Sequence, residues 1–454
     1  MKLILSIIVI LSLCIGCTAT QKSVNSDNSF VLTHINIVDV AGQKIQHDKH
    51  LVIVQGKIVD ILSSHQINQY PQLKRISGYG GFITPGLIDM HVHMYEPAAY
   101  LFALSHGVTH VRIMNGIPAH LKWREQINSG QLIGSSSTVS SPILSGYENA
   151  HLHHTVKTKQ QAQQAVKQYH SEGYDLIKAY GNLSEEALSA IISEAARLNM
   201  PVAKHGPHGS GDMPLNALSN LQSFEHVEDI YQGLLEYQFE TDGLDDIISE
   251  LKATNTPITP TLNIFAQLTN LSQYKEQYLL HTKPEYTSEL IAFEANKNQV
   301  KRWLTASNKM IKHNQKTLAF LIDITKKLNQ NEIPLLVGSD SGVLLSPHGI
   351  ATHKELKLLE QAGLSPYQAL KAATINPAKA LGLEKQMGQI KTNYQADFIY
   401  TLSNPIDNLS VLEMPMAVIK EGRWVSQQTF VKMRQDAIDS RSLWQELIAL
   451  AQAL

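Results

Sequence analysis

The segment GFITPGLIDMHVH, residues 81–93, carries the strongest fold signal in this chain of 454 residues. Its apolar run, Phe82–Asp89, is typical of a strand buried on both faces, and it leads into the pair His91 and His93. Side chains two residues apart in an extended chain point to the same side, so both imidazoles can reach one metal ion. A His-x-His pair alone is weak support for a metal site, and its place directly after a buried strand strengthens the interpretation.

Further runs of apolar and β-branched residues alternate with amphipathic helices along the middle of the chain. One of these helices is expected at Ser184–Leu198, with two acids in its first turn. Eight strands joined by helical crossovers predict an α/β fold with a (β/α)8 TIM-like barrel rather than an open doubly wound sheet. The expected strands are Phe82–Asp89, Val108–Ile113, Thr138–Ile143, Leu176–Tyr180, Val202–His205, Ser223–Glu225, Ile258–Leu262 and Leu335–Gly338.

The two ends of the chain have a different sequence pattern from the middle. Residues 30–76 form short alternating runs separated by turns, with Gly56 at an expected hairpin. A similar pattern returns only at residues 388–402 and 416–425. Both ends together are therefore predicted to form one small β-sandwich domain beside the barrel.

A long polar segment without glycine lies between the seventh and eighth expected strands, and its residues are typical of helices. It is interpreted as an insert, either a lid that gates substrate access or an elaborated final crossover. The predicted boundaries are signal peptide 1–17, tether 18–30, β-sandwich 31–81 and 385–430, barrel 82–384 with the insert 263–331, and C-terminal helix 431–454.

The first 17 residues, MKLILSIIVILSLCIGC, follow the design of a secretory signal. The apolar run Leu3–Leu13 is too short to span a bilayer, and small residues lead to Cys17. The only two cysteines are Cys14 and Cys17, so no disulfide can join parts of the mature domain. The segment resembles a bacterial lipoprotein signal, which implies lipidation of Cys17 and a chain anchored in the cell envelope, facing the periplasm or the surface. The alternative is an ordinary cleaved signal with release into the periplasm.

Composition narrows the class of partner. The chain is 43% hydrophobic and 17% charged, which excludes a disordered or fibrous protein. Its net charge is −2 and it has no long basic run, which argues against a nucleic-acid partner. The expected partner is a small molecule, with membrane contact through the lipid anchor only. The oligomeric state stays open, with a homo-oligomer as one option.

Other expected strands also end in residues able to bind metals. Lys178, His205 and His226 follow the fourth, fifth and sixth strands, and Asp340 follows the eighth. Because the C-terminal ends of barrel strands meet at one mouth, we expect these side chains to converge with the His-x-His pair. Chance agreement of this kind is improbable. Imidazole and carboxylate ligands suit zinc, with manganese, cobalt or iron as alternatives.

Lys178 lies in YDLIKAYGN, residues 174–182, and a lone lysine there would normally carry its ammonium to water. At the mouth of this barrel, a cationic ammonium would be repelled by two divalent ions. A neutral amine can instead add carbon dioxide to form an anionic carbamate, whose two oxygens can bridge two metals. We therefore interpret Lys178 as a carboxylated lysine.

The combined set resembles the amidohydrolase superfamily, in particular its branch with a carboxylated lysine and a binuclear site. GVTHVR at 107–112, the segment 347–383 and GQIKTNYQADFIY at 388–400 are similar to imidazolonepropionase-like and prolidase-like members. The resemblance extends from Val31 to Val425. It implies a (β/α)8 barrel plus a β-sandwich.

The resemblance also implies roles for the individual residues. His91 and His93 would bind the more buried of two divalent metal ions, and Asp340 would be both ligand and proton shuttle. His205 and His226 would hold the second metal, and carboxylated Lys178 would bridge the pair. The set of implied metal-binding residues is His91, His93, Lys178, His205, His226 and Asp340.

Several positions depart from the family pattern or have weaker assignments. His208 in HGPHG is displaced by one residue from the second histidine of relatives, and VRIMNG after the second strand lacks their aspartate. Tyr231 is a candidate oxyanion donor, with ordinary packing as the favoured alternative. His153 and His154 are expected to be exposed bystanders. The candidates for substrate binding are His151, His208, Arg112 and His348.

The implied reaction is attack of a metal-bridging hydroxide on an amide C–N bond of a small substrate. A dipeptide is the first expectation and a cyclic amide the second, while an ester or lactone stays open. A deaminase is disfavoured because His208 stands where deaminases of the superfamily carry a glutamate. The alternative from a different class is a non-catalytic, metal-containing binding lipoprotein.

Overall fold

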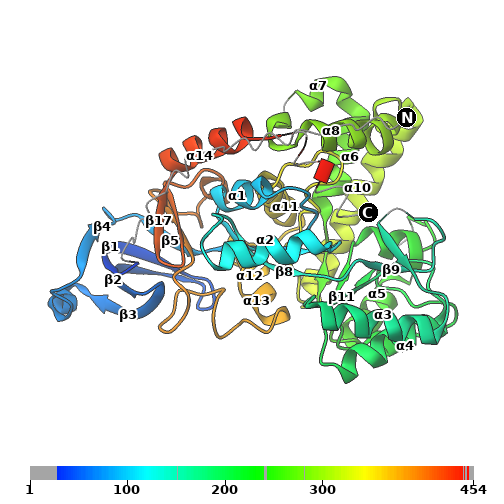
Figure 1. Ribbon diagram of the computed structural model, residues 1–454, viewed down its shortest axis with the longest axis horizontal. Coiled ribbons are helices and arrows are strands. Elements are labelled where there is room, and N and C mark those ends of the chain that lie inside the picture. Colours follow the sequence, from blue (N-terminus) through cyan, green and yellow to red (C-terminus); the bar gives the residue numbers. More distant parts are fainter. Residues whose placement is uncertain are drawn as a thin grey trace, which may run out of the picture.

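The computed structural model describes residues 28–150, 152–239, 243–280 and 282–442, together with Trp444, Leu447 and Ile448 (Figure 1). The predictions for the signal segment and Cys17 lie outside these residues, as does the one for His151. In the part of the chain that the structure describes, no helix combines the length and the apolar character needed to cross a membrane.

Both ends of the chain build one eight-stranded sheet, seen beside the barrel in Figure 1. Its order is β17-β16-β15-β5-β1-β2-β3, with β4 paired to β1. Side chains from both halves, among them Ile37, Ile83, Phe398 and Ile419, pack into one buried core. The strands are β1 Phe30–Asp39, β2 Lys44–Val54, β3 Lys57–Ser63, β4 Lys74–Ser77, β5 Phe82–Pro85, β15 Phe398–Thr401, β16 Ala417–Lys420 and β17 Arg423–Ser426.

The expected strand Phe82–Asp89 is two strands, which corrects the prediction. β5 pairs with β15 in the β-sandwich, and β6 (Leu87–Val92) begins the barrel. The break falls at Gly86, where a Cβ would lie 2.2 Å from Thr109 Oγ1, so only glycine allows this close approach. One short segment therefore joins the two domains and carries the first histidine.

The barrel strands are parallel and follow one another in chain order, except that β10 lies on the far side of β9. They form a three-stranded sheet, β6-β7-β8, and a six-stranded sheet, β10-β9-β11-β12-β13-β14. Bridges from Ser140 to Leu176, from Ile258 to Leu335 and from Val92 to Ser341 link these sheets and the eighth segment, residues 335–341. The strands are β7 Val108–Ile113, β8 Ser136–Val139, β9 Ile143–Ser145, β10 His153–Thr155, β11 Ile177–Ala179, β12 Val202–His205, β13 Ser223–Glu225 and β14 Ile258–Thr259.

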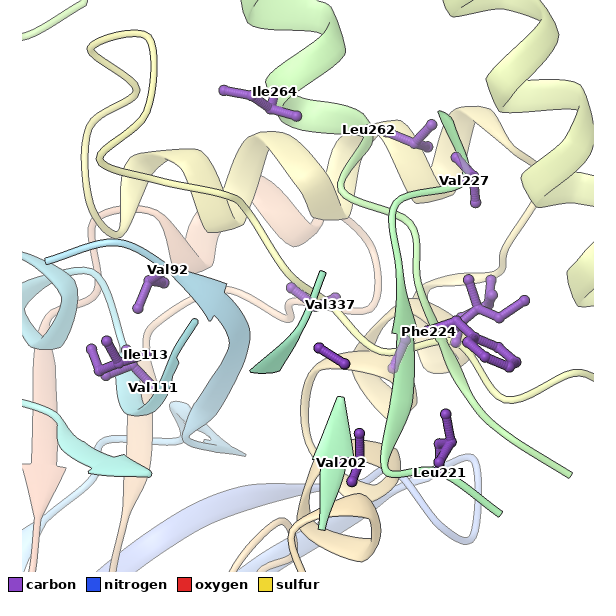
Figure 2. Close-up of a cluster of buried hydrophobic side chains, with 14 of the residues drawn as sticks. Val92, Val111, Ile113, Val202, Leu221, Phe224, Val227, Leu262, Ile264 and Val337 are labelled. Atoms are coloured by element: carbon purple, nitrogen blue, oxygen red, sulfur yellow. The ribbon is translucent and has the colours of Figure 1, made fainter. Parts of the chain in front are cut away.

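Three further expected strands differ from those observed. The third expected strand, Thr138–Ile143, spans the end of β8 and the start of β9. The seventh stops at Thr259, because Pro260 has no N–H to donate to a neighbouring strand. The eighth is joined to its neighbours by isolated bridges and by bonds such as Met90 N–H to Val337 O at 2.8 Å. Figure 2 shows Val92, Val111, Val202, Phe224 and Val337 among the buried side chains that these strands contribute.

Helices cover the barrel and match the predicted pattern. The expected helix Ser184–Leu198 is confirmed as α4 (Glu185–Arg197), whose N-cap Ser184 accepts a hydrogen bond from the N–H of Ala187. The other helices outside the insert are α1 Ala98–Ser105, α2 Pro118–Asn128, α3 Lys159–Glu172, α5 Leu244–Ala253, α11 Ile350–Gln361, α12 Pro366–Ala373, α13 Ile375–Ala380 and α14 Gln427–Asp439.

The insert between β14 and the eighth strand segment is helical. It reaches the mouth of the barrel, since the backbone N–H of Leu344, four residues after Asp340, donates to Gln299 Oε1 at 3.0 Å. Its α-helices are α6 Leu262–Tyr274, α7 Glu276–Leu279, α8 Glu289–Ala295, α9 Lys301–Leu304 and α10 Asn308–Gln330, with a π-helical turn at Asn296–Val300.

Arg441, just past α14, ties the insert to the barrel mouth. Its guanidinium makes a two-point contact with the Glu96 carboxylate, at 2.9 and 2.7 Å, three residues after His93. The same guanidinium donates to the backbone oxygens of Glu285 at 2.6 Å and Thr287 at 3.4 Å in the insert. Both partners of the ion pair are largely buried, so water screens it little.

Replacing Arg441 with alanine should loosen this connection. We expect a loss of about 2–3 kcal/mol, because a largely buried carboxylate loses its cation, and a lower Tm by about 2–4 °C per kcal/mol. Limited proteolysis should then cut faster within the insert. Lys432→Ala, on the exposed face of α14, is the matched control. Equal Tm and equal cleavage rates for the two variants would show that Arg441 does not hold the insert.

Candidate metal centre

Five of the six predicted ligands carry rings or carboxylates that meet at the C-terminal ends of the barrel strands. Asp340 Oδ1 lies 3.6 Å from His91 Nε2 and 3.0 Å from His93 Nε2. The ring of His226 lies with its centroid 4.7 Å from that of His91 and 4.5 Å from that of His205. The structure therefore brings these residues together as the strand-end pattern predicted.

Lys178, the sixth, lies in β11 with 1% of its surface exposed. Its Nζ has no hydrogen-bond partner among the described residues. Burial lowers the pKa of Lys178 to about 8, with the buried Arg112 acting in the same direction and Glu225 opposing it. A buried amine in this state is unusual and needs either a partner or a chemical modification.

The donor set fits divalent metal ions. One ligand atom each from His91, His93 and Asp340 lies within 4.8 Å of the others. Burial lowers the pKa of His91 to about 4 and that of His226 to about 3, so both imidazoles are neutral near pH 7, the form that binds metals. Burial would raise the pKa of Asp340, but the imidazoles of His91 and His93 outweigh this and hold it well below its usual range.

Two of the proposed ligands have strained backbones. His226 has φ +70° and Asp340 has φ +51°, the left-handed region that non-glycine residues rarely enter. Such conformations cost about 1–3 kcal/mol each and persist where the surrounding contacts fix them, commonly at functional sites. The strain therefore supports a functional role for this end of the barrel.

A buried carboxylate, Asp89, fixes two of the ligand-bearing segments. Its Oδ1 accepts the backbone N–H of His91 at 3.2 Å and that of Ser339 at 2.9 Å. Its Oδ2 accepts the hydroxyl of Thr352 at 2.6 Å. Asp89 thereby holds β6 and the eighth strand segment together, a role that the sequence pattern did not indicate because the residue reads as part of the strand.

Glu225 orients the first histidine. His91 Nδ1 lies 2.8 Å from Glu225 Oε2, so a proton on Nδ1 leaves Nε2 free on the side of Asp340. Burial would raise the pKa of Glu225, but Arg112 outweighs it and holds the pKa well below its usual range. Glu225 directly precedes His226, but its place inside an expected strand gave no indication of this role.

Arg112 is placed differently from its prediction as a substrate-binding residue. Its side chain is fully buried, and Nη2 lies 2.6 Å from Glu225 Oε1. Its other nitrogens donate to Met90 O at 2.7 Å, Gln222 Oε1 at 2.9 Å and Ser223 Oγ at 2.8 Å. The guanidinium is therefore fully engaged in hydrogen bonds inside the barrel and is not available to a substrate.

His205 lies in a polar corner of the site. Its ring stacks on Tyr180 at a centroid distance of 3.8 Å, and its Nε2 lies 3.2 Å from Asp229 Oδ2. Burial raises the pKa of Asp229 to about 6, against the opposing effect of Lys204. His208 lies beside this corner, since a Cβ on Gly206 would be 2.6 Å from its Nε2.

The remaining predicted residues fall into two groups. His348 is near the site, with Nδ1 2.9 Å from the hydroxyl of Ser341, which follows Asp340. Tyr231 is 2% exposed, and its ring packs against Phe239 at 4.9 Å, so it has the packing role that was the favoured alternative.

His153 and His154, predicted to be exposed, are half-buried. His153 Nδ1 lies 3.0 Å from Ser145 Oγ, and its ring centroid is 5.1 Å from that of Tyr180. His154 Nδ1 lies 2.6 Å from the hydroxyl of Tyr169. Both rings are therefore packed against tyrosines, which corrects the expectation of solvent exposure.

A second group of metal-binding side chains, His34, Asp48 and His50, lies in the β-sandwich. The backbone N–H of His34 donates to His50 Nδ1 at 3.0 Å. A neutral imidazole that accepts at Nδ1 carries its proton on Nε2, and so offers no free lone pair to a metal. His50 therefore takes part in this group as a hydrogen-bond acceptor through Nδ1.

Known proteins resemble this chain over most of its length. The ochratoxinase of Aspergillus niger is 24% identical over 371 residues, which cover 77% of this chain and 64% of the relative. The imidazolonepropionase of Photorhabdus laumondii subsp. laumondii is 23% identical over 401 residues, covering 79% of this chain and 85% of the relative.

Solved structures bear on the fold. A crystal structure of a proposed prolidase from Bifidobacterium longum superposes with a TM-score of 0.67 at 22% identity, over 90% of this chain and 99% of that chain. The likeness confirms the predicted architecture, a TIM barrel with a β-sandwich built from both ends. The profile of the amidohydrolase family matches residues 82–425, from β5 through the barrel to β17. The chain belongs to the amidohydrolase family.

Proposed function

We propose that this protein is a binuclear metal-dependent hydrolase that cleaves an amide C–N bond of a small substrate. The observation that carries the proposal is Lys178, a fully buried amine without a hydrogen-bond partner in the described chain, close enough to His91, His226 and Asp340 to interact with them electrostatically. His91, His93 and Asp340 would hold the more buried ion, and His205 and His226 the second. Two divalent ions, proposed to be zinc, would polarise the carbonyl and generate hydroxide near neutral pH when bound.

Lys178 would supply the bridge between the two ions. Its neutral amine adds to the carbon of dissolved carbon dioxide, a new N–C bond forms, and one amine proton is released to water, which leaves an anionic carbamate. Burial favours this step because it increases the neutral fraction of the amine. The carbamate carries one negative charge and two oxygens into a site whose other members include neutral imidazoles.

Asp340 would move the proton during hydrolysis. Its carboxylate lies 3.0 Å from His93 Nε2, at the mouth of the barrel, and its pKa is held low, so it is ionised and able to accept a proton. As water attacks the scissile carbonyl, Asp340 takes the proton from the attacking water and returns it to the leaving nitrogen. The same group thus acts as base and then as acid.

A dipeptide is the proposed substrate class, supported by the motifs shared with prolidase-like proteins and by the likeness to the Bifidobacterium longum structure. A cyclic amide is the second candidate, supported by the similarity to imidazolonepropionase. Esters and lactones would react with the same nucleophile. A deaminase is disfavoured because His208 replaces the expected glutamate, and release of ammonia from an aminated ring would indicate it.

We also propose that Cys17 anchors the chain to the cell envelope, with the catalytic domains outside the cytoplasm. The support is the signal-like sequence of residues 1–17. Labelling of the wild-type protein, but not of a Cys17→Ala variant, with a radioactive or alkyne-bearing fatty acid is the direct test.

Lys178→Ala should remove the second metal and lower kcat by at least about 100-fold, because the bridging carboxylate is lost. A short carboxylic acid such as acetate or propionate should restore part of the activity by entering the vacated space. Metal content by mass spectrometry and turnover of a dipeptide library are the measurements. Lys371→Ala, an exposed lysine on α12, is the control. Two metals and full turnover in Lys178→Ala would contradict the carbamate bridge.

Carboxylation should depend on pH in a defined direction. With a pKa of about 8, the neutral fraction of Lys178 rises from about 1% at pH 6 to about half at pH 8, whereas an ordinary lysine stays below about 1%. Metal-free protein should therefore regain activity about 50-fold faster at pH 8 than at pH 6, at equal dissolved carbon dioxide and equal free zinc. A reactivation rate that ignores carbon dioxide would argue against the modification.

Asp340→Asn should leave the shape of the site nearly unchanged while removing its proton acceptor. We expect kcat on the best substrate of a dipeptide library to fall by about 10²–10⁴-fold, the usual contribution of a general acid–base group. Asp323→Asn, at an exposed position of α10, controls for the loss of one charge. Unchanged turnover in Asp340→Asn would refute the shuttle, and an inactive wild-type protein across the library would favour a non-catalytic binding protein.

A further inference from the structure

Thr261 has an unusual position at the junction between the barrel and the insert. It follows β14 by two residues and is the N-cap of α6, the first helix of the insert. Its backbone has φ 53° and ψ 39°, and its surface is 2% exposed. The left-handed region is strongly disfavoured for a β-branched residue, so a buried threonine there requires compensating contacts.

The hydroxyl of Thr261 does not serve the helix that it precedes. A threonine at an N-cap normally accepts a hydrogen bond from a backbone N–H in the first turn. Within the described residues, the Thr261 side chain makes no such bond to α6. Its oxygen is instead 2.7 Å from His226 Nδ1 and 2.8 Å from the backbone oxygen of Pro260.

These two contacts fix the proton on the histidine. The single hydroxyl proton of Thr261 is donated to Pro260 O, so its oxygen can only accept a hydrogen bond from His226. His226 must then carry its proton on Nδ1, which leaves the lone pair on Nε2 at the opposite edge of the ring. The neighbouring rings of His91 and His205 have centroids 4.7 and 4.5 Å from that of His226.

The backbone reinforces the same arrangement. The N–H of His226 donates to Thr259 O at 2.9 Å, and the N–H of Val227 donates to Pro260 O at 3.2 Å. The left-handed His226 and the left-handed Thr261 therefore face each other across the ends of β13 and β14, and the side-chain bond joins them. Two strained residues are each held in place by the other strand.

We propose that Thr261 is a positioning residue that fixes the tautomer and ring orientation of His226, so that Nε2 is presented to the second metal. The inference rests on the proposed metal site, because it assigns His226 a ligand role. A consequence is that the second metal position and the attachment point of the insert share one residue. A shift of α6 at its first turn would be transmitted to His226 through a single hydrogen bond.

Three variants separate this role from ordinary packing. Thr261→Val keeps the shape and the branched Cβ but removes the acceptor, and should weaken binding of the second zinc about 10–100-fold. Thr261→Ser keeps the hydroxyl and should bind the second zinc within about threefold of the wild type. Thr269→Val removes another buried hydroxyl from α6, one that bonds Phe265 O at 2.8 Å, and should leave both zinc affinities unchanged.

Zinc titration with a competing chelator measures the affinities, and nitrogen-15 spectra of histidine-labelled, metal-free protein measure the tautomer, with His226→Gln to assign the signal. Support requires Nδ1 protonation of His226 in the wild type and in Thr261→Ser, and a mixture of tautomers in Thr261→Val. Equal second-zinc affinity for Thr261→Val and wild type, or Nε2 protonation of His226 in the wild type, would overturn the role of Thr261.

The same data keep the two proposals apart. A wild-type protein that holds fewer than two zinc ions would overturn the binuclear function. The tautomer of His226 in the metal-free protein would still support or overturn the positioning role of Thr261, since that measurement requires no metal.

Discussion

The buried ion pair between Arg112 and Glu225 is the interaction on which the rest of the site depends. Both side chains are fully removed from water, so each charge requires the other, and removing one partner of such a pair typically costs about 3–5 kcal/mol. The guanidinium extends from β7 to contact β6 through Met90 O and β13 through Ser223 and Glu225. Because Glu225 also holds His91 Nδ1, the pair links barrel stability to the geometry of the candidate metal centre.

Much of the architecture follows from short sequence patterns. Continuous apolar runs predicted a parallel barrel, and the recurrence of alternating residues at both ends predicted the β-domain. The errors lie at strand ends, where a single residue outweighs the pattern: Gly86 divides the first strand, and Pro260 ends the seventh. Sequence periodicity reports burial, but it does not report where a backbone must bend to let another strand approach.

The site shows the same division between what sequence reveals and what it leaves out. Residues at strand ends could be predicted to form one site because barrel topology brings all such ends to one mouth. The groups that orient these residues could not be predicted in the same way. Asp89, Glu225 and Thr261 all lie within expected strands, so neither spacing nor composition marks them. Arg112 shows the opposite error. It was expected to bind substrate, but its guanidinium is hydrogen-bonded to Glu225 in the barrel interior.

The pairing of β5 with β15 has a consequence for how the protein is made. Residues 82–85 emerge early in synthesis, but their partners, residues 398–401, emerge more than 300 positions later. Until then, β5 presents an open edge, and unpaired edges invite association with other chains. Contacts this distant in sequence also slow folding. The segment that leads to His91 therefore gains its last strand partner only when most of the chain has been made, which makes residues 398–401 a condition for fixing the start of the first barrel strand.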